Sequence, residues 1–95
     1  MNKKYFRLSE VMEICEVSEK FVLALERENL IRFVRRKRVK LYPLDQLDRI
    51  RVAHVLVKQL GVNLQGVEVA LHLRQQVIDA RRELASLLSR VRNQT

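Results

Sequence analysis

The sequence has few residues that break or cross-link a chain. Its 95 residues include two glycines, one proline, one cysteine and no tryptophan. So few glycines and prolines argue against an all-β sandwich, a collagen-like chain or a disordered linker, and they favour helices joined by short turns. A single cysteine, Cys15, forms no internal disulfide, and no apolar run approaches the ~20 residues of a membrane span. Because no apolar signal core follows the charged N-terminus, we expect a cytoplasmic protein.

Positive charge is what the sequence has in excess. Lys and Arg number 19 against 11 Asp and Glu, which gives a formal charge of +8. This imbalance predicts a polyanionic partner: nucleic acid first, an anionic membrane surface second and an acidic protein surface third. The hydrophobic fraction of 47% is enough for one small core.

Two short helices are predicted near the N-terminus. Ser9 is the expected N-cap of the first, whose apolar face includes Val11 and Ile14. Ser18 is the expected N-cap of the second, which runs to Glu28. Their tight connection makes the pair a helix-turn-helix candidate.

A basic β-hairpin is predicted over residues 31–42. Ile31 and Phe33 alternate with Arg32, and apolar residues alternate with cations again from Val39. Six cations and no acid lie within residues 32–40. A charged edge strand is the plainer interpretation, but edge protection needs one or two charges rather than six.

Two further helices are predicted in the second half of the chain. The first starts near Pro43 and reaches about Leu60, where Gly61 ends it. Asn63 is the expected cap of the second, which continues to about Arg92 and is roughly 43 Å long.

The last helix carries a heptad seam. Apolar residues recur at alternating spacings of three and four, at Ala70, Leu73, Val77, Ala80, Leu84, Leu87 and Val91. The helix could fold back on its own domain, but so small a domain is too short to cover it. We therefore expect a homodimer formed along this seam.

The order of these elements resembles the MerR superfamily of winged helix-turn-helix proteins. The residues that carry the resemblance are Phe6–Val11, Val17–Ser18, Glu26–Ile31 and Leu41–Leu47. Residues Leu60–Leu71 are similar to the heat-shock repressor (HspR-type) and chaperone-modulator (CbpM-type) branches. The first branch implies a bacterial repressor that binds duplex DNA, and the second implies binding to the J-domain of a co-chaperone.

The sequence departs from the MerR pattern at three places. Members usually carry Arg-Tyr-Tyr late in the second helix, where this chain has Leu23-Ala24-Leu25. The glycine before the wing is Asn29, and the Asn-Gly wing tip is replaced by Arg35-Arg36-Lys37-Arg38. The first change resembles the chaperone-modulator branch, whereas the basic wing favours DNA binding.

We therefore predict a mainly α winged helix-turn-helix domain over residues 1–62, with a short basic β-hairpin wing. A long C-terminal dimerisation helix, a coiled coil, follows over residues 63–95. The predicted function is a nucleoid-associated transcription regulator, a repressor rather than an activator, that binds duplex DNA as a dimer. The alternatives are a chaperone modulator and a nonspecific nucleoid or phage accessory protein. The second helix is expected in the major groove, with the wing and the N-terminal arm along the phosphates. The predicted DNA-binding residues are Lys3, Lys4, Arg7, Glu19, Lys20, Leu23, Arg27, Arg32, Arg35, Arg36, Lys37, Arg38 and Lys40.

Catalytic and ligand sites are not predicted. His54 and His72 have no second cysteine or clustered carboxylates beside them, so we expect no metal and no cofactor. There is no Gly-rich phosphate loop and no paired-carboxylate pocket. The sequence therefore predicts neither an enzyme nor a small-molecule effector site.

Overall fold

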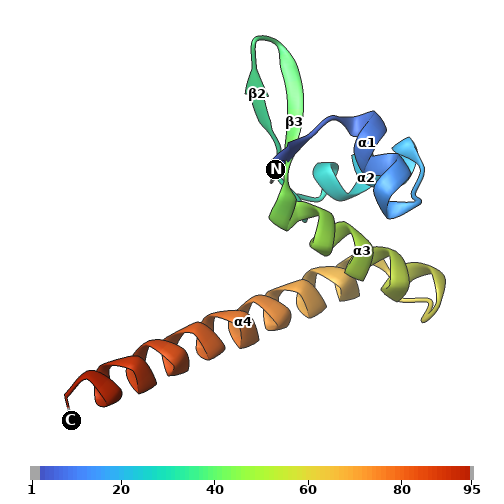
Figure 1. Ribbon diagram of the computed structural model, residues 1–95. Helices are drawn as coiled ribbons and strands as arrows, with labels where there is room; N and C mark the ends of the chain where they lie inside the picture. The colour runs from blue at the N-terminus through green and yellow to red at the C-terminus, as the bar shows by residue number, and fades with distance from the viewer. Residues whose placement is uncertain (1–2, 95) are drawn as a thin grey trace.

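The computed structural model describes residues 3–94, which form a small head and a long protruding helix (Figure 1). The mainly α winged helix-turn-helix fold is confirmed. Its elements in chain order are β1 (Tyr5–Phe6), α1 (Leu8–Cys15), α2 (Glu19–Arg27), β2 (Val34–Arg36), β3 (Val39–Pro43), α3 (Leu44–Lys58) and α4 (Leu64–Asn93).

Side-chain caps explain where the helices begin. The Oγ of Ser18 accepts a hydrogen bond from the Phe21 N–H at 3.1 Å, and Oδ1 of Asn63 accepts one from the Gly66 N–H at 2.8 Å, as predicted. The prediction for Ser9 is wrong, because α1 already begins at Leu8. There the Arg7 N–H donates to Glu10 at 2.9 Å, and this bond lowers the pKa of the Glu10 carboxyl. Glu10, at the third position of α1, therefore makes Arg7 the N-cap, two residues before the predicted Ser9.

Both connections that flank α2 use left-handed residues. Glu16 ends α1 with φ of 55°, and Asn29 follows α2 with φ of 58°. Asparagine tolerates this conformation better than most residues, which explains how Asn29 replaces the glycine of the MerR pattern.

The wing is a tight antiparallel hairpin. Strand β3 lies between β1 and β2, with Phe6 opposite Tyr42 and Arg36 opposite Val39. The two turn residues, Lys37 and Arg38, both have positive φ, of 50° and 66°. Turns of this kind match the twist of the strands, although glycine or asparagine usually occupies them.

The hairpin is shorter than the one that alternating apolar and basic residues predict over residues 31–42. Strand β2 begins at Val34 rather than at Ile31, and the Ile31 side chain lies in the core. The Arg32 N–H donates to the Gln46 side chain of α3 at 2.9 Å, which holds this segment against α3 instead of β3.

The core lies between the helix-turn-helix, β3, α3 and the first turns of α4. Its fully buried side chains are Val11, Val22, Leu25, Tyr42, Ile50, Val67 and Leu71. Helix α3 ends at Lys58, two residues before the predicted Leu60, and Gly61 reverses the chain with φ of 67°. Two apolar residues of α3, Leu44 and Val55, are exposed. The apolar face of α3 is therefore narrower than its sequence suggests.

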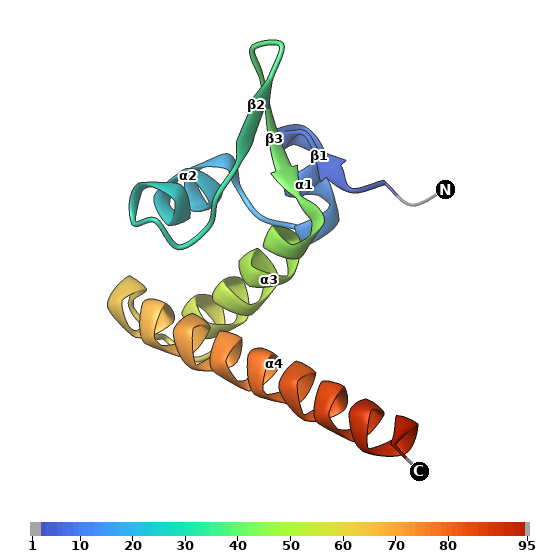
Figure 2. The ribbon, with the colours of Figure 1, turned by 90° about the vertical axis from the view of Figure 1, so that its left-hand side faces the viewer.

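The first half of α4 packs on the head. Val67 and Leu71 are buried against α3, and the rest of the helix extends away from it (Figure 2). Its 30 residues correspond to a length of about 45 Å.

Candidate nucleic-acid interface

Helix α2 turns one face outward and one into the core. Val22 and Leu25 are buried, whereas Glu19, Lys20 and Arg27 are exposed. Leu23 is half-buried between these exposed residues. At 100° per residue, the four residues predicted to meet DNA share one helical face.

The wing tip presents four consecutive exposed cations, Arg35, Arg36, Lys37 and Arg38. Two of them lie over aromatic rings at the base of the hairpin. The Arg35 guanidinium is 5.4 Å from the centre of the Phe33 ring, and that of Arg36 is 4.5 Å from the Tyr5 ring. These contacts orient the two side chains while leaving their charges exposed to solvent.

Lys40 differs from the other hairpin cations because it faces inward. Its ammonium forms an ion pair with Glu26 of α2 and lies 4.3 Å from the centre of the Phe33 ring. The side chains of Lys40 and Glu26 are only 25% and 10% exposed. The Tyr42 hydroxyl donates to the same Glu26 carboxylate at 2.8 Å, and burial together with this acid raises the pKa of Tyr42. Lys40 therefore joins the wing to α2.

Glu26 was not among the predicted site residues. The one signal in the sequence is its position four residues after Val22, which places an acid at the edge of the buried face of α2. An acid there needs a partner, and the register of β3 turns both Lys40 and Tyr42 toward it.

The N-terminal arm lies on the other side of the wing from α2 (Figure 2). Lys3 forms an ion pair with Glu10, and the Lys4 carbonyl accepts a hydrogen bond from the Leu44 N–H at 2.9 Å. Lys4 and Arg7 are exposed. Arg32, before β2, pairs with Asp45 at 3.6 Å, with both side chains more than 60% exposed. The predicted cations therefore form two groups. The wing-tip cations are exposed, whereas Lys3, Arg32 and Lys40 around them form ion pairs within the protein.

The predicted heptad seam is exposed along α4. Leu73, Val77, Leu84, Leu87 and Val91 are each about half exposed. The side of α4 that contacts the head is centred on Val67, Leu71 and Ile78, roughly 130° around the helix from the seam.

His54 and Cys15 pack against neighbouring groups, whereas His72 is exposed. His54 meets the Phe21 ring edge-on, with 5.4 Å between ring centres, and His72 contacts the Gln76 amide at 3.3 Å. Cys15 is buried and its Sγ lies 3.8 Å from the Leu47 carbonyl oxygen; burial raises the pKa of the thiol. Within residues 3–94 no group of three or more His, Cys, Asp and Glu side chains could hold a metal ion. No helix in the described part of the chain is long and apolar enough to cross a membrane.

The geometry defines a winged helix-turn-helix protein: a capped second helix with an open outer face, a basic hairpin tied to it, and a long following helix. The chain matches the family model of the MerR HTH family of regulatory proteins over residues 6–89 and belongs to that family. Searches of curated proteins and of solved structures give no match. Family membership supports a DNA-binding transcription regulator as the class of function.

Substituting Glu26 tests the connection between α2 and the wing. Glu26→Gln keeps an acceptor for the Tyr42 hydroxyl but leaves the Lys40 ammonium largely buried without a countercharge. We expect the free energy of unfolding to fall by about 2 kcal/mol, measured by urea denaturation. Glu28→Gln, on an exposed side chain, is the matched control and should change it by no more than ~0.5 kcal/mol. Equal stabilities of the two variants would contradict this role of Glu26.

Proposed function

We propose that the protein is a dimeric transcriptional repressor that binds duplex DNA through the outer face of α2 and the wing. The observation that carries the proposal is the wing tip, where four consecutive cations lie exposed on a hairpin beside the helix-turn-helix. Membership in the MerR HTH family supports the same class of function. A repressor is favoured over an activator because so small a chain offers little surface for recruiting polymerase.

On this proposal α2 lies in the major groove. Lys20 and Arg27 would contact phosphates or base edges from its outer face, and Glu19 would accept from a cytosine amino group. Arg35, Arg36, Lys37 and Arg38 would follow the phosphates beside the groove, with Lys4 and Arg7 adding contacts from the arm. Lys40 would act indirectly, because its ion pair with Glu26 sets the position of the wing relative to α2.

Dimerisation along the α4 seam would present two such heads to one DNA molecule. An antiparallel pairing about Ala80 brings Leu73 opposite Leu87 and Val77 opposite Leu84, and it sets the small Ala70 against Val91. A parallel pairing would instead stack Ala70 on Ala70 and the basic C-terminal turns on each other. Packing and charge thus both favour the antiparallel dimer.

The alternative function, a chaperone modulator of the CbpM type, rests on one observation. Leu23, at the place of the usual arginine, is half-buried and offers no hydrogen-bond donor to DNA. A head that keeps the fold but lacks this contact would suit binding to a J-domain. The wing favours DNA, since four exposed cations at its tip have no evident use against the basic helix of a J-domain.

A salt titration distinguishes the two functions. In fluorescence anisotropy with random duplex DNA, neutralisation of about six phosphates gives a log–log slope of affinity against salt near −5. A steep slope with submicromolar affinity at moderate salt is the expected result. Weak binding with a shallow slope would refute the proposal, and calorimetry with a J-domain would then test the alternative.

A further inference from the structure

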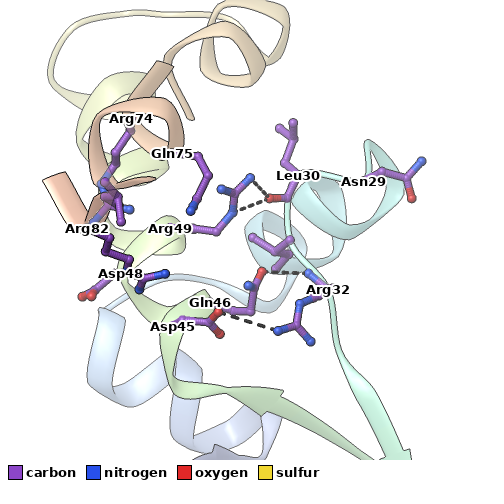
Figure 3. A pocket seen from close by; sticks show the side chains of 12 residues that line it. Asn29, Leu30, Arg32, Asp45, Gln46, Asp48, Arg49, Arg74, Gln75 and Arg82 are labelled. Carbon is purple, nitrogen blue, oxygen red and sulfur yellow. Dashed lines mark hydrogen bonds and ion pairs between the residues drawn. The ribbon is translucent and has the colours of Figure 1, made fainter. Parts of the chain in front are cut away.

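A groove of about 610 Å³ runs between the head and α4 (Figure 3). The segment after α2, the start of α3 and the middle of α4 all contribute to its walls. Its charged lining residues are Arg32, Asp45, Asp48, Arg49, Arg74 and Arg82. The groove therefore carries four arginines and two aspartates, a net charge of +2.

Most of this positive charge is not neutralised inside the protein. Arg32 and Asp45 pair with each other at 3.6 Å. Arg49, Arg74 and Arg82 form no ion pair within 4.0 Å in the part of the chain that the structure describes, and Asp48 is the one remaining acid of the lining. Three arginines thus face one carboxylate, and the groove attracts anions.

Arg49 is held in a fixed orientation. Its Nε and Nη2 donate to the Leu30 carbonyl oxygen at 3.0 and 2.8 Å, which leaves its other N–H groups available (Figure 3). Partial burial, and then the charge of Arg74, lower the pKa of Arg49. The two cations raise each other's energy, so an anion between them would be stabilised.

The groove stays open when the other proposed surfaces are occupied. Ile78 and Arg82 lie about 130° and 170° around α4 from the heptad seam and Arg74 about 90°, so a second copy on the seam leaves Ile78 and Arg82 uncovered. The wing projects from the side of the head away from α4 (Figures 1 and 2), and of the predicted DNA-binding residues only Arg32, which pairs with Asp45, lines the groove. The groove is therefore a separate surface.

The spacing of the cations indicates the kind of ligand. Arg74 and Arg82 are eight residues apart on one helix, a rise of about 12 Å, and Arg49 faces them from α3. An extended chain with carboxylates three or four residues apart matches this backbone rise, at ~3.3 Å per residue. We propose that this groove binds an acidic segment of a protein partner, with Arg49, Arg74 and Arg82 as its carboxylate contacts.

The test uses the full chain and a fluorescently labelled octaglutamate peptide, with octaglutamine as the uncharged comparison. Arg74→Gln with Arg82→Gln is expected to weaken octaglutamate binding about tenfold or more in fluorescence anisotropy, because two charge-assisted contacts are lost. Arg81→Gln with Arg90→Gln is the matched control: it removes the same charge from exposed residues of the same helix that do not line the groove. Its affinity should fall by about twofold at most.

Three results would overturn the proposal. Equal losses in both double variants would mean that the peptide responds only to net charge. Displacement of octaglutamate by an equal concentration of citrate would mean that the groove takes a small anion instead. An equal loss of duplex DNA binding in Arg74→Gln with Arg82→Gln would make the groove part of the DNA surface. The assay measures peptide binding and not DNA binding. A protein that fails to bind the peptide can therefore still bind DNA as proposed, and a protein that fails to bind DNA can still bind the peptide.

Discussion

Removing three cations from the wing tip is expected to weaken binding to random duplex DNA about a hundredfold at moderate salt. The variant combines Arg35→Ala, Arg36→Ala and Arg38→Asn; asparagine is chosen for the last because Arg38 has φ of 66°. Each lost phosphate contact removes roughly one charge-assisted hydrogen bond and one released counterion. The slope of log affinity against log salt should therefore become shallower by about 2.7, measured by anisotropy over a salt series.

A control variant loses the same number of positive charges outside the wing. It distinguishes the effect of wing contacts with DNA from that of the protein's overall positive charge. Lys58, Arg81 and Arg90 are exposed and lie outside the predicted DNA surface, so replacing all three by glutamine gives the same net charge. The wing interpretation fails if this control loses as much affinity as the wing variant does. Urea denaturation of both proteins checks that the hairpin survives the loss of the ring contacts of Arg35 and Arg36. If the chain is a chaperone modulator instead, the wing variant should bind a J-domain as well as the parent protein does.

Features of the fold that depend on neighbouring residues could be predicted from the sequence. Ser18 and Asn63 cap helices as expected because a cap is a bond across three residues. The positive tip of the hairpin and the long apolar repeat of α4 are likewise patterns within one segment. The failure at Ser9 has the same local origin, since the bond between the Arg7 N–H and Glu10 fixes an earlier start.

Features that depend on distant segments could not be predicted. Nothing near Ile31 in the chain indicates that Gln46 holds the preceding part of the hairpin against α3. Lys40 has the same sequence character as Arg38, and only the packing of β3 on α2 turns it toward Glu26. The groove is a further case, because Arg49 and Arg74 meet only through the turn between α3 and α4.

Charge on the α4 seam is expected to produce a monomer. Leu84→Glu with Leu87→Glu replaces side chains that are about half exposed in the single chain and would be buried in the dimer. Each buried leucine contributes about 2 kcal/mol, and a dimer contains two copies of each, so association should weaken more than a thousandfold. Light scattering should then report half the mass of the parent protein. Affinity for duplex DNA should fall as well, because two linked heads bind one molecule more tightly than one head does.

The matched control for this variant places the same charges on another side of the same helix. Ser86 and Ser89 are exposed and lie away from the seam, so Ser86→Glu with Ser89→Glu should remain dimeric. Dissociation of this control would mean that added charge alone disrupts association, whereas an unchanged mass for the leucine variant would exclude the seam as the interface. The two variants carry equal net charge, so a difference between them in mass and in DNA affinity reports the apolar seam itself. That difference would also connect the exposed leucines of α4 to the need for two heads on one DNA molecule.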